Sequence, residues 1–270
     1  MRILRETRLS MTVELGELTV TMLSDGETAM PLTHLRGPDG GPLSEAALEG
    51  ADLVGDRLRL PVRAFLVRGP QGALLIDTGA SNAWHPSLGR LPEALREADA
   101  DPREVTAVAL THTHVDHLSG LVDRDRGLAF PNALRIFVAT EELMAFRAEP
   151  RMIPVLPRLM ALEQGDGVFP GVTAINAPGH SPGHMAFLVE GRLLIWGDLV
   201  HHAAVQFAVP QVTWIYDDDQ PMARRSRLSL MQQALDAGWL VAGAHLPHPG
   251  IGRIERRGEG YAYHPVTRGA

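Results

Sequence analysis

Short apolar runs separated by turn residues dominate the first part of the chain. Residues 17–23 (ELTVTML) alternate between polar and apolar side chains, as a half-buried strand does, and the Ser-Asp-Gly sequence at 24–26 predicts a turn after them. Residues 73–76 (ALLI) predict a buried strand that ends at Asp77, and residues 105–110 (VTAVAL) predict a second buried strand. These patterns indicate strands that end in polar residues.

Segments with helical spacing lie between and after these strands. Residues 91–98 predict a helix with Pro92 in its first turn, and residues 140–148 predict another with Thr140 as its N-cap. Residues 226–237 predict a third helix, because their apolar side chains recur at helical intervals. Further short strands are predicted at 172–175, 186–189, 193–196 and 240–244. Strands that alternate with helices indicate a layered fold of the α/β or α+β class.

One segment leaves two interpretations open. Residues 144–160 are rich in Met, Ile and Leu but are interrupted by three prolines. The segment is either a peripheral helix packed on the core or an adaptable wall over an apolar pocket. No linker, low-complexity run or composition break divides the sequence. We therefore expect a single domain over residues 1–270, with residues 1–15 as an N-terminal extension.

Composition removes whole mechanisms. The 270 residues include no Cys, and all 25 of the Lys+Arg residues are Arg, which excludes thiol nucleophiles, thiolate metal sites and Lys-based covalent catalysis. The formal net charge of −7 argues against a nucleic-acid partner. No apolar run approaches the roughly 20 residues of a membrane span. No leader-like apolar segment follows Met1, which predicts a cytoplasmic protein, with removal of a signal before Met1 as the alternative.

The 12 His residues point to the chemistry of the chain. The sequence THTHVDHLSG places His112, His114, Asp116 and His117 directly after the second predicted strand. In an extended chain, side chains two positions apart point to the same side, so His112 and His114 can reach one ion. A turn into a helix then aims Asp116 and His117 at a neighbouring position. A solvated polar loop is the alternative interpretation.

Three later donors stand at strand ends or in a rigid loop. His180 lies in the sequence APGHSPGH, whose Pro and Gly residues suit a loop that holds a ligand. Asp198 and His245 each follow a predicted strand. Imidazole and carboxylate donors suit Zn²⁺, Mn²⁺, Co²⁺ or Fe²⁺. Because the donors outnumber those of one tetrahedral ion, they fit two neighbouring ions bridged by a carboxylate and a water-derived hydroxide.

The ordered motifs HxHxDH, GHxxGH, Gly-Asp and a late His resemble those of the metallo-β-lactamase superfamily, from about Leu74 to Gly252. The resemblance implies a four-layer αββα sandwich with two metal ions at one edge of its sheets. It implies that His112, His114 and His180 bind the first metal, that Asp116, His117 and His245 bind the second, and that Asp198 bridges them. It further implies that Asp77 supports the ligand loop, and we expect His184 to play a supporting role as well.

The segments WGDLVHHAAVQFAVP and VAGAHLPHPGIGRI resemble more narrowly the methyl parathion hydrolase branch, which is related to the metal-dependent N-acyl-homoserine lactonases. The branch implies a binuclear hydrolase, with zinc as the expected metal and Mn, Co or Fe as alternatives. A bridging hydroxide would attack a lactone, another ester or a phosphotriester, with Asp116 and Asp198 as the catalytic carboxylates. The substrate would be a small molecule, and homodimers are common in this branch.

Other activities of the same superfamily are the alternatives: a thioester hydrolase of the glyoxalase II type, a β-lactamase, or a mononuclear iron dioxygenase. A binding protein with an inactive site is the non-enzymatic alternative. The chain also departs from the branch at two places. His248 stands where a bulky aromatic residue is expected, and the Tyr that many lactonases carry between the GHxxGH and Gly-Asp motifs is absent. For His201, His202 and His248, pocket and structural roles stay open.

Overall fold

Two β-sheets form the body of the computed structural model, which describes residues 1–123, 125 and 127–268. In spatial order, the first sheet contains β1 (Arg2–Glu6), β2 (Ser10–Leu15), β3 (Leu18–Pro31), β6 (Arg57–Gly69), β7 (Gly72–Ile76), β8 (Val105–Ala109), β9 (Arg135–Ala139) and β10 (Leu159–Leu162), and β5 (Leu53–Val54) pairs with β6. The second contains β11 (Gly167–Phe169), β12 (Val172–Asn176), β13 (Met185–Val189), β14 (Leu193–Ile195), β16 (Leu240–Ala242), β17 (Ile251–Arg257) and β18 (Gly260–Pro265). A separate small ladder joins β4 (Leu35–Arg36) to β15 (Thr213–Trp214).

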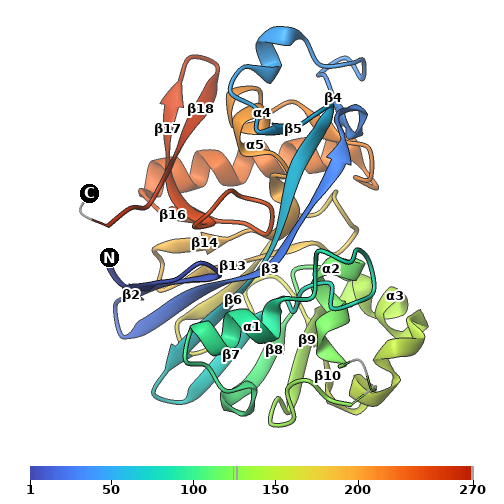
Figure 1. Cartoon of the computed structure of the whole chain (residues 1–270), viewed down its shortest axis with the longest axis vertical. Helices are drawn as coiled ribbons and strands as arrows, with labels where there is room; N and C mark the ends of the chain where they lie inside the picture. Colours follow the sequence, from blue (N-terminus) through green and yellow to red (C-terminus); the bar gives the residue numbers. More distant parts are fainter. Residues whose placement is uncertain (124, 126, 269–270) are drawn as a thin grey trace.

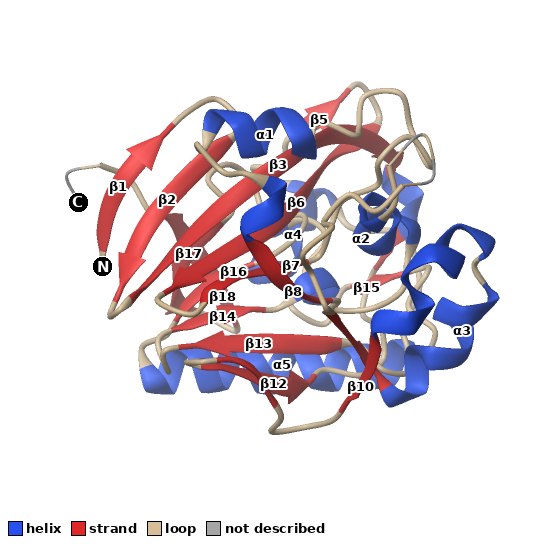
Figure 2. Cartoon of the chain, turned by 90° about the horizontal axis from the view of Figure 1, so that it is seen from below, coloured by secondary structure: helices blue, strands red, loops and turns tan. Residues whose placement is uncertain are grey.

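Helices cover the outer faces of the two sheets (Figures 1 and 2). The α-helices are α1 (Leu91–Glu97), α2 (Val115–Leu118), α3 (Leu143–Ala148), α4 (Ala203–Ala208) and α5 (Gln220–Ala237). Short 3₁₀ segments are η1 (Leu32–His34), η2 (Glu45–Leu48), η3 (Pro102–Glu104), η4 (Ser119–Leu121), η5 (Thr140–Glu142), η6 (Pro150–Arg158) and η7 (Gly197–Leu199). No helix among the described residues is both long enough and apolar enough to traverse a bilayer.

Three apolar layers hold this arrangement together. Phe65 of the first sheet and Phe187 of the second belong to the cluster between the sheets. On β7, Leu74 faces this central cluster whereas Leu75 faces a second cluster beneath α1. Successive strand side chains point to opposite faces, so a continuously apolar run such as ALLI is buried on both. A third cluster, which includes Met231 of α5, covers the second sheet. The αββα layering expected from the sequence is therefore confirmed.

Most predicted elements are present with shifted ends. The strands predicted at 73–76, 105–110, 172–175, 186–189, 193–196 and 240–244 correspond to β7, β8, β12, β13, β14 and β16, and the helix at 91–98 corresponds to α1. The predicted helix at 226–237 begins earlier, at Gln220. Its first turns are rich in Arg and lack an apolar stripe, but the Asp219 carboxylate accepts a hydrogen bond from the Met222 amide and caps the helix.

The predicted turn at 24–26 is wrong, because β3 continues through it to Pro31. The register against β6 shifts between Ser24 and Gly26, and Gly26 has a φ of +122°. These residues therefore form a bulge inside a strand rather than a turn after it. The carboxylate of Asp25 points inward and accepts hydrogen bonds from the amides of Ala80, Gly89 and Leu91. Asp25 therefore anchors the loop before α1.

Two further expectations need correction or resolution. Thr140 is not the N-cap of a helix: η5 begins at Thr140, and its cap position, Ala139, makes no side-chain hydrogen bond. The proline-rich segment forms η6, and its Met152 and Val155 pack into the apolar cluster beneath the first sheet. This geometry matches the peripheral packing interpretation rather than the pocket wall, since other segments line the cavity over the His and Asp cluster described below.

Candidate metal centre

The seven predicted donors converge where the strands of both sheets end. His112, His114, His180 and Asp198 form one group whose donor atoms all lie within 4.8 Å of one another. Asp116, His117, His245 and again Asp198 form a second group by the same criterion. Six of the seven side chains are buried, and His114 is half-buried. The arrangement offers two adjacent positions for a cation with one carboxylate common to both.

Asp198 is the centre of this arrangement. The Nε2 atoms of His117, His180 and His245 lie 3.1, 3.3 and 3.0 Å from its carboxylate oxygens. The Nε2 atom of His112 is 3.8 Å away. Opposite charge close to a buried carboxylate favours its ionised form, and although burial acts against ionisation, these imidazoles hold the pKa of Asp198 well below its usual value. A permanently negative oxygen pair at this position suits a divalent cation.

Asp77 supports the loop that carries four of the donors. It follows β7 with a φ of 60° and accepts a hydrogen bond from the Thr111 amide at 2.8 Å. Its second oxygen accepts from Nδ1 of His117, also at 2.8 Å. This contact leaves the Nε2 atom of His117 facing Asp198. The structure thus places Asp77 where the resemblance implied a supporting carboxylate.

The other outward-facing imidazole nitrogens are also engaged. His180 donates from Nδ1 to Asp217 at 2.9 Å, and His245 donates from Nδ1 to the Pro61 carbonyl at 2.7 Å. His184 donates to the Ala177 carbonyl, and its Nε2 accepts from the Asp198 amide at 3.0 Å. Each contact fixes a ring orientation or a tautomer. Burial lowers the pKa of His184 to about 3, which keeps this ring neutral and able to accept.

Several buried atoms in the cluster lack any hydrogen-bond partner among the described residues. They include Nε2 of His112, Nε2 of His117 and Oδ1 of Asp198. Buried polar atoms are nearly always satisfied, so orphaned atoms that face one another indicate an absent partner. The electrostatics of His117 agree with this interpretation. Burial acts to lower the pKa of His117, but the carboxylates of Asp198, Asp116 and Asp77 raise it well above its usual value, which shows that their negative charge favours a cation here. The donor atoms and the negative charge of the carboxylates among them therefore fit bound divalent metal ions.

Sequence reasoning missed two residues that organise the site. Asp217 stands in a run of three Asp residues, and nothing in the sequence separates it from its neighbours. Glu142 is buried and accepts hydrogen bonds from the Thr113 amide and hydroxyl and from the Gly183 amide. It thereby connects the loop of His112 and His114 to the loop of His180. A carboxylate two residues into a predicted helix gave no signal for this role.

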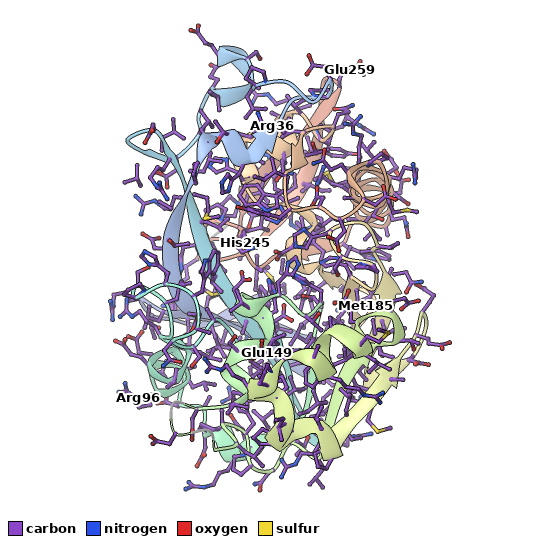
Figure 3. All side chains as sticks on the ribbon, turned by 90° about the vertical axis from the view of Figure 1, so that its right-hand side faces the viewer. Arg36, Arg96, Glu149, Met185, His245 and Glu259 are labelled. Atoms are coloured by element: carbon purple, nitrogen blue, oxygen red, sulfur yellow. The ribbon has the colours of Figure 1, made fainter. Side chains whose placement is uncertain are left out.

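A cavity of about 300 Å³ opens above the cluster. Its wall is largely apolar and aromatic, and includes Met30, Leu60, Trp84, Trp214 and Tyr216. His245 also lines it and lies near the middle of the molecule in Figure 3. Apart from the predicted donors, most side chains that line the cavity are uncharged. The cavity can therefore hold an uncharged organic group against the donor atoms.

The three His residues whose roles the sequence left open take different positions. His201 lines the cavity, lies 3.4 Å from Asp198 and stacks on Trp214 with 4.5 Å between ring centroids. Neither of its ring nitrogens has a hydrogen-bond partner among the described residues. His202 is buried and borders a different cavity. His248 borders that second cavity too, but its side chain is largely exposed and approaches Glu6.

Comparison with known proteins gives a family match over most of the chain. Residues 57–245 match the metallo-beta-lactamase superfamily. An N-acyl homoserine lactonase of Bacillus thuringiensis is 28% identical over 170 residues, which cover 55% of this chain and 66% of the relative. A Bacillus cereus protein of the same description is 30% identical over 158 residues, which cover 50% of this chain and 61% of the relative. The chain thus spans slightly less than two thirds of the length of these curated relatives.

Solved structures share the whole fold. AidC, described as a dizinc quorum-quenching lactonase and solved with a product bound, has a TM-score of 0.83 and 24% identity, covering 96% of this chain and 98% of its own. The hydrolase AbOPH, described as a member of the beta lactamase superfamily, has a TM-score of 0.85 and 25% identity, covering 97% of this chain and 99% of its own. The similarity therefore extends over nearly every element described above.

Proposed function

The chain belongs to the metallo-beta-lactamase superfamily, and from this premise we propose that it is a metal-dependent hydrolase that opens lactones or cleaves related small esters. The observation that carries the proposal is the pair of donor groups that share Asp198 at the floor of an apolar cavity. The descriptions of its relatives as N-acyl homoserine lactonases support the choice of substrate class. Phosphotriesters are a second substrate class to be tested at the same site.

We assign His112, His114 and His180 to one metal ion and Asp116, His117 and His245 to another, with Asp198 between them. The orphaned buried atoms support this assignment. Zinc is the favoured metal, because the donors are imidazoles and carboxylates and because AidC is described as dizinc. When bound, such ions supply an activated water near neutral pH and polarise a carbonyl or phosphoryl oxygen.

The chain itself would position the reaction partners. The contacts of Asp77, Asp217 and Pro61 hold three imidazoles in fixed orientations, so little reorganisation is needed as charge develops. The aromatic wall would receive the apolar part of the substrate and exclude bulk water. Asp116 lines the cavity, and we assign to a carboxylate oxygen of this residue a proton relay: it would accept the proton released by the attacking water and pass it to the leaving oxygen.

Metal content and substrate turnover test the proposal together. We expect about two divalent ions per chain in purified protein, loss of activity with a chelator, and recovery with zinc. Acyl-homoserine lactones, aryl esters, a phosphotriester, a thioester and a β-lactam form the substrate panel. Replacement of Asp198 by Ala should remove metal and activity, whereas Asp218→Ala, which changes an exposed carboxylate, should change neither.

Each outcome of this experiment separates two hypotheses. One iron ion per chain, with oxygen consumption, would favour a dioxygenase over a hydrolase. Turnover confined to the thioester or the β-lactam would move the chain to another activity of its superfamily. Failure to bind any divalent ion would leave a binding protein, and the proposal would be abandoned.

A further inference from the structure

A second cavity, of about 410 Å³, lies against the face of β6 that points away from the cavity over the donor cluster. Arg59, Pro61 and Arg63 line it, whereas the intervening Leu60 lines the other cavity. Successive side chains of a strand point to opposite faces, so the β3–β6 ribbon separates the two spaces. His245 borders both. We call the second space the Arg63 chamber; Arg59, Arg63, His202, Ala203, Ala204 and His248 are among its lining residues.

Arg63 is a buried cation with few partners. The residue is 5% exposed, and among the described residues it has no ion-pair partner within 4.0 Å, although the charge of Glu27 acts on it from a greater distance. Its Nε donates to the Leu246 carbonyl at 2.7 Å, and its Nη1 approaches the Met22 sulfur at 3.3 Å. No described residue accepts a hydrogen bond from its Nη2. Burial lowers the pKa of Arg63 to about 10, which leaves it charged at neutral pH.

The chain contains a direct comparison in Arg227, which is buried to a similar degree. Arg227 donates to three backbone carbonyls, at 2.6, 3.1 and 2.7 Å, and lies 3.8 Å from the Asp217 carboxylate. This is how a buried guanidinium is normally satisfied, because an unpaired buried charge is strongly destabilising. The partners of Arg227 are a structural set, whereas Arg63 keeps part of its donor fork available beside a cavity.

The carboxylates that line the chamber around Arg63 are already paired with another residue. His202 is buried, and its Nδ1 has no hydrogen-bond partner among the described residues. The two carboxylates at the rim, Glu27 and Asp52, both pair with Arg59. Gly250 leaves room for the stem of this side chain, because a Cβ at position 250 would lie 2.7 Å from Cδ of Arg63. The guanidinium of Arg63 thus keeps an unengaged donor at the wall of the chamber.

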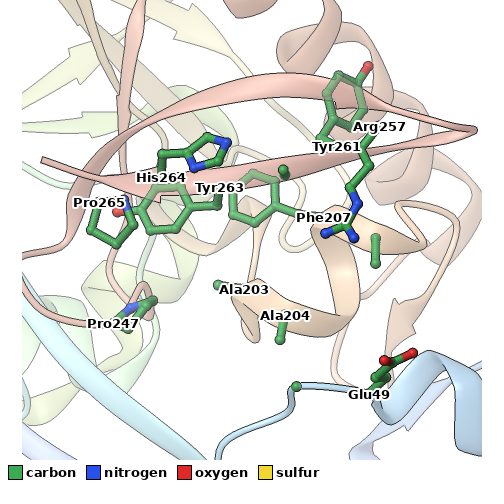
Figure 4. A pocket seen from close by; sticks show the side chains of 13 residues that line it. Glu49, Ala203, Ala204, Phe207, Pro247, Arg257, Tyr261, Tyr263, His264 and Pro265 are labelled. Carbon is green, nitrogen blue, oxygen red and sulfur yellow. The ribbon is translucent and has the colours of Figure 1, made fainter.

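A larger cleft, lined by small, aromatic and a few charged side chains, continues from the Arg63 chamber. It measures about 700 Å³ and shares Gly50, Ala203, Ala204 and Pro247 with the chamber. Figure 4 shows it between α4 and the β17–β18 hairpin, with the rings of Phe207 and Tyr263 on one side. These two rings are stacked, with 5.1 Å between their centroids. An apolar group that extends from the chamber would meet small and aromatic side chains here.

We propose that the Arg63 chamber binds the oxyanion of a small amphiphilic molecule, a carboxylate or a phosphate, whose apolar portion occupies the adjoining cleft. The fork of Arg63 would donate to the oxyanion, and His202 would form part of the same wall. Because Arg63 also donates to the carbonyl of Leu246, the residue after His245, occupancy would steady the loop that carries this donor. The chamber has His245 in common with the lining of the reaction cavity, but oxyanion binding does not depend on what that cavity hydrolyses.

Calorimetric titration of the full, zinc-loaded chain tests this site with three probes: acetate, octanoate and inorganic phosphate at constant ionic strength. We expect saturable binding of one oxyanion per chain, with octanoate tighter than acetate if the cleft takes the apolar portion. Arg63→Met should weaken binding at least about tenfold, the loss expected for a charge-assisted hydrogen bond. Arg253→Met, which removes an exposed Arg from β17, is the matched control and should bind like the unchanged chain.

A second variant keeps Arg63 in place. Ala204→Glu introduces a carboxylate from α4 into the chamber that Arg63 lines and should abolish binding even if Arg63→Met does not fold. Oxyanions can also bind to zinc, and in that case both variants would retain the full affinity of the unchanged chain. That result, or the absence of saturable binding in the unchanged chain, would overturn the proposal. Phosphate binding without octanoate binding would assign the chamber to phosphates and remove the cleft from the site.

Discussion

At the scale of single residues, the geometry of the donor cluster depends on side chains that lie outside it and hold its imidazole rings. Asp217, Asp218 and Asp219 are adjacent in sequence but have different roles: Asp217 orients His180, Asp219 caps α5, and the side chain of Asp218 is exposed. The burial and direction of each carboxylate decide which role it takes. Substitutions of these neighbours therefore separate a loss of charge from a loss of ring orientation.

Asp217→Asn removes the anionic partner of His180. The Nδ1 atom of His180 then loses a charge-assisted hydrogen bond, and the ring is free to rotate away from Asp198. We expect zinc affinity to fall by roughly 10–100-fold, the range observed for such supporting partners. Competition with a chromophoric chelator measures this change. Asp218→Asn should keep the original affinity, and an equal loss in both variants would show that total charge rather than orientation matters.

Glu142→Gln should weaken folding in a pH-dependent manner. Burial acts to raise the pKa of Glu142, but hydrogen bonds from the surrounding loops, Thr113 and Gly183 among them, hold it below the usual 4.5. A depressed pKa in the folded state contributes stability above pH 4.5, and this contribution is lost as the pH falls through the folded value. The variant should therefore be less stable by about 1–3 kcal/mol at pH 7, with the difference shrinking below pH 4.5.

Urea unfolding at several pH values measures this difference, and Glu141→Gln serves as the control because Glu141 is exposed. A stability difference that stays constant from pH 7 to pH 4 would contradict the assigned role of the ionised carboxylate.

The seven predicted donors could be picked out from the sequence, because all of them lie in compact motifs or shortly after apolar strands. Asp217 and Glu142 were not, since their partners are distant in sequence: Asp217 meets His180, and Glu142 meets Thr113. A carboxylate gives the same local signal whether it is solvated or holds a loop. Only the tertiary contacts of η5 and of the turn before α5 with the donor loops distinguish the two cases.

At the scale of elements, the loop with the sequence APGHSPGH is held by its contact with α5. The Gly179 carbonyl accepts a hydrogen bond from the Asp219 amide, directly before the helix begins. Gly179 has a φ of +125°, and a Cβ on it would lie 2.1 Å from the Ala223 amide nitrogen. The close approach of loop and helix places His180, and it requires a residue without a side chain.

Gly179→Ala should therefore displace α5 from the loop. We expect a loss of stability well above the roughly 1 kcal/mol that a positive φ alone costs a non-glycine residue. Gly191→Ala is the matched control, because Gly191 also has a positive φ, of 60°, but a Cβ added there would meet no described atom within 4 Å. Thermal unfolding and zinc stoichiometry measure both effects. Similar losses in the two variants would contradict a steric role for Gly179.

Strands and helices with a regular apolar pattern were predicted correctly from the sequence. Segments whose polar residues make caps or tertiary contacts were placed wrongly. The start of α5 was missed because its first turns carry Arg instead of apolar residues, although Asp219 and Pro221 provide a cap and an N-terminal Pro. The polar residues at 24–26 suggested a turn, but their amide and carboxylate groups serve a bulge and a tertiary anchor. Local composition does not distinguish these outcomes.

At the scale of the whole molecule, the centre connects the two halves of the sandwich. His112, His114, Asp116 and His117 follow β8 of the first sheet. His180, Asp198 and His245 follow β12, β14 and β16 of the second. Metal binding would therefore add a cross-link between sheets that otherwise contact through apolar side chains. The layering itself was expected from the family resemblance, whereas periodicity alone indicated only alternating strands and helices.

Removal of metal should lower the stability of the whole fold. A ligand at about 1,000 times its dissociation constant stabilises a folded protein by about 4 kcal/mol per site. We expect a chelator to lower the thermal unfolding temperature, and added zinc to restore it in a concentration-dependent manner. Differential scanning calorimetry measures this. The Asp198→Ala variant should show no response to zinc, and a normal response there would place the bound ion elsewhere.

The distribution of the donors along the chain also has a consequence for biosynthesis. His245 follows His112 by nearly half of the 270 residues, so the ribosome needs on the order of ten seconds to deliver both. A nascent chain that has emerged only as far as Asp198 holds the complete first group but lacks one donor of the second. Metal acquisition would thus follow the order of synthesis, and the second position can close only after β16 has added to its sheet.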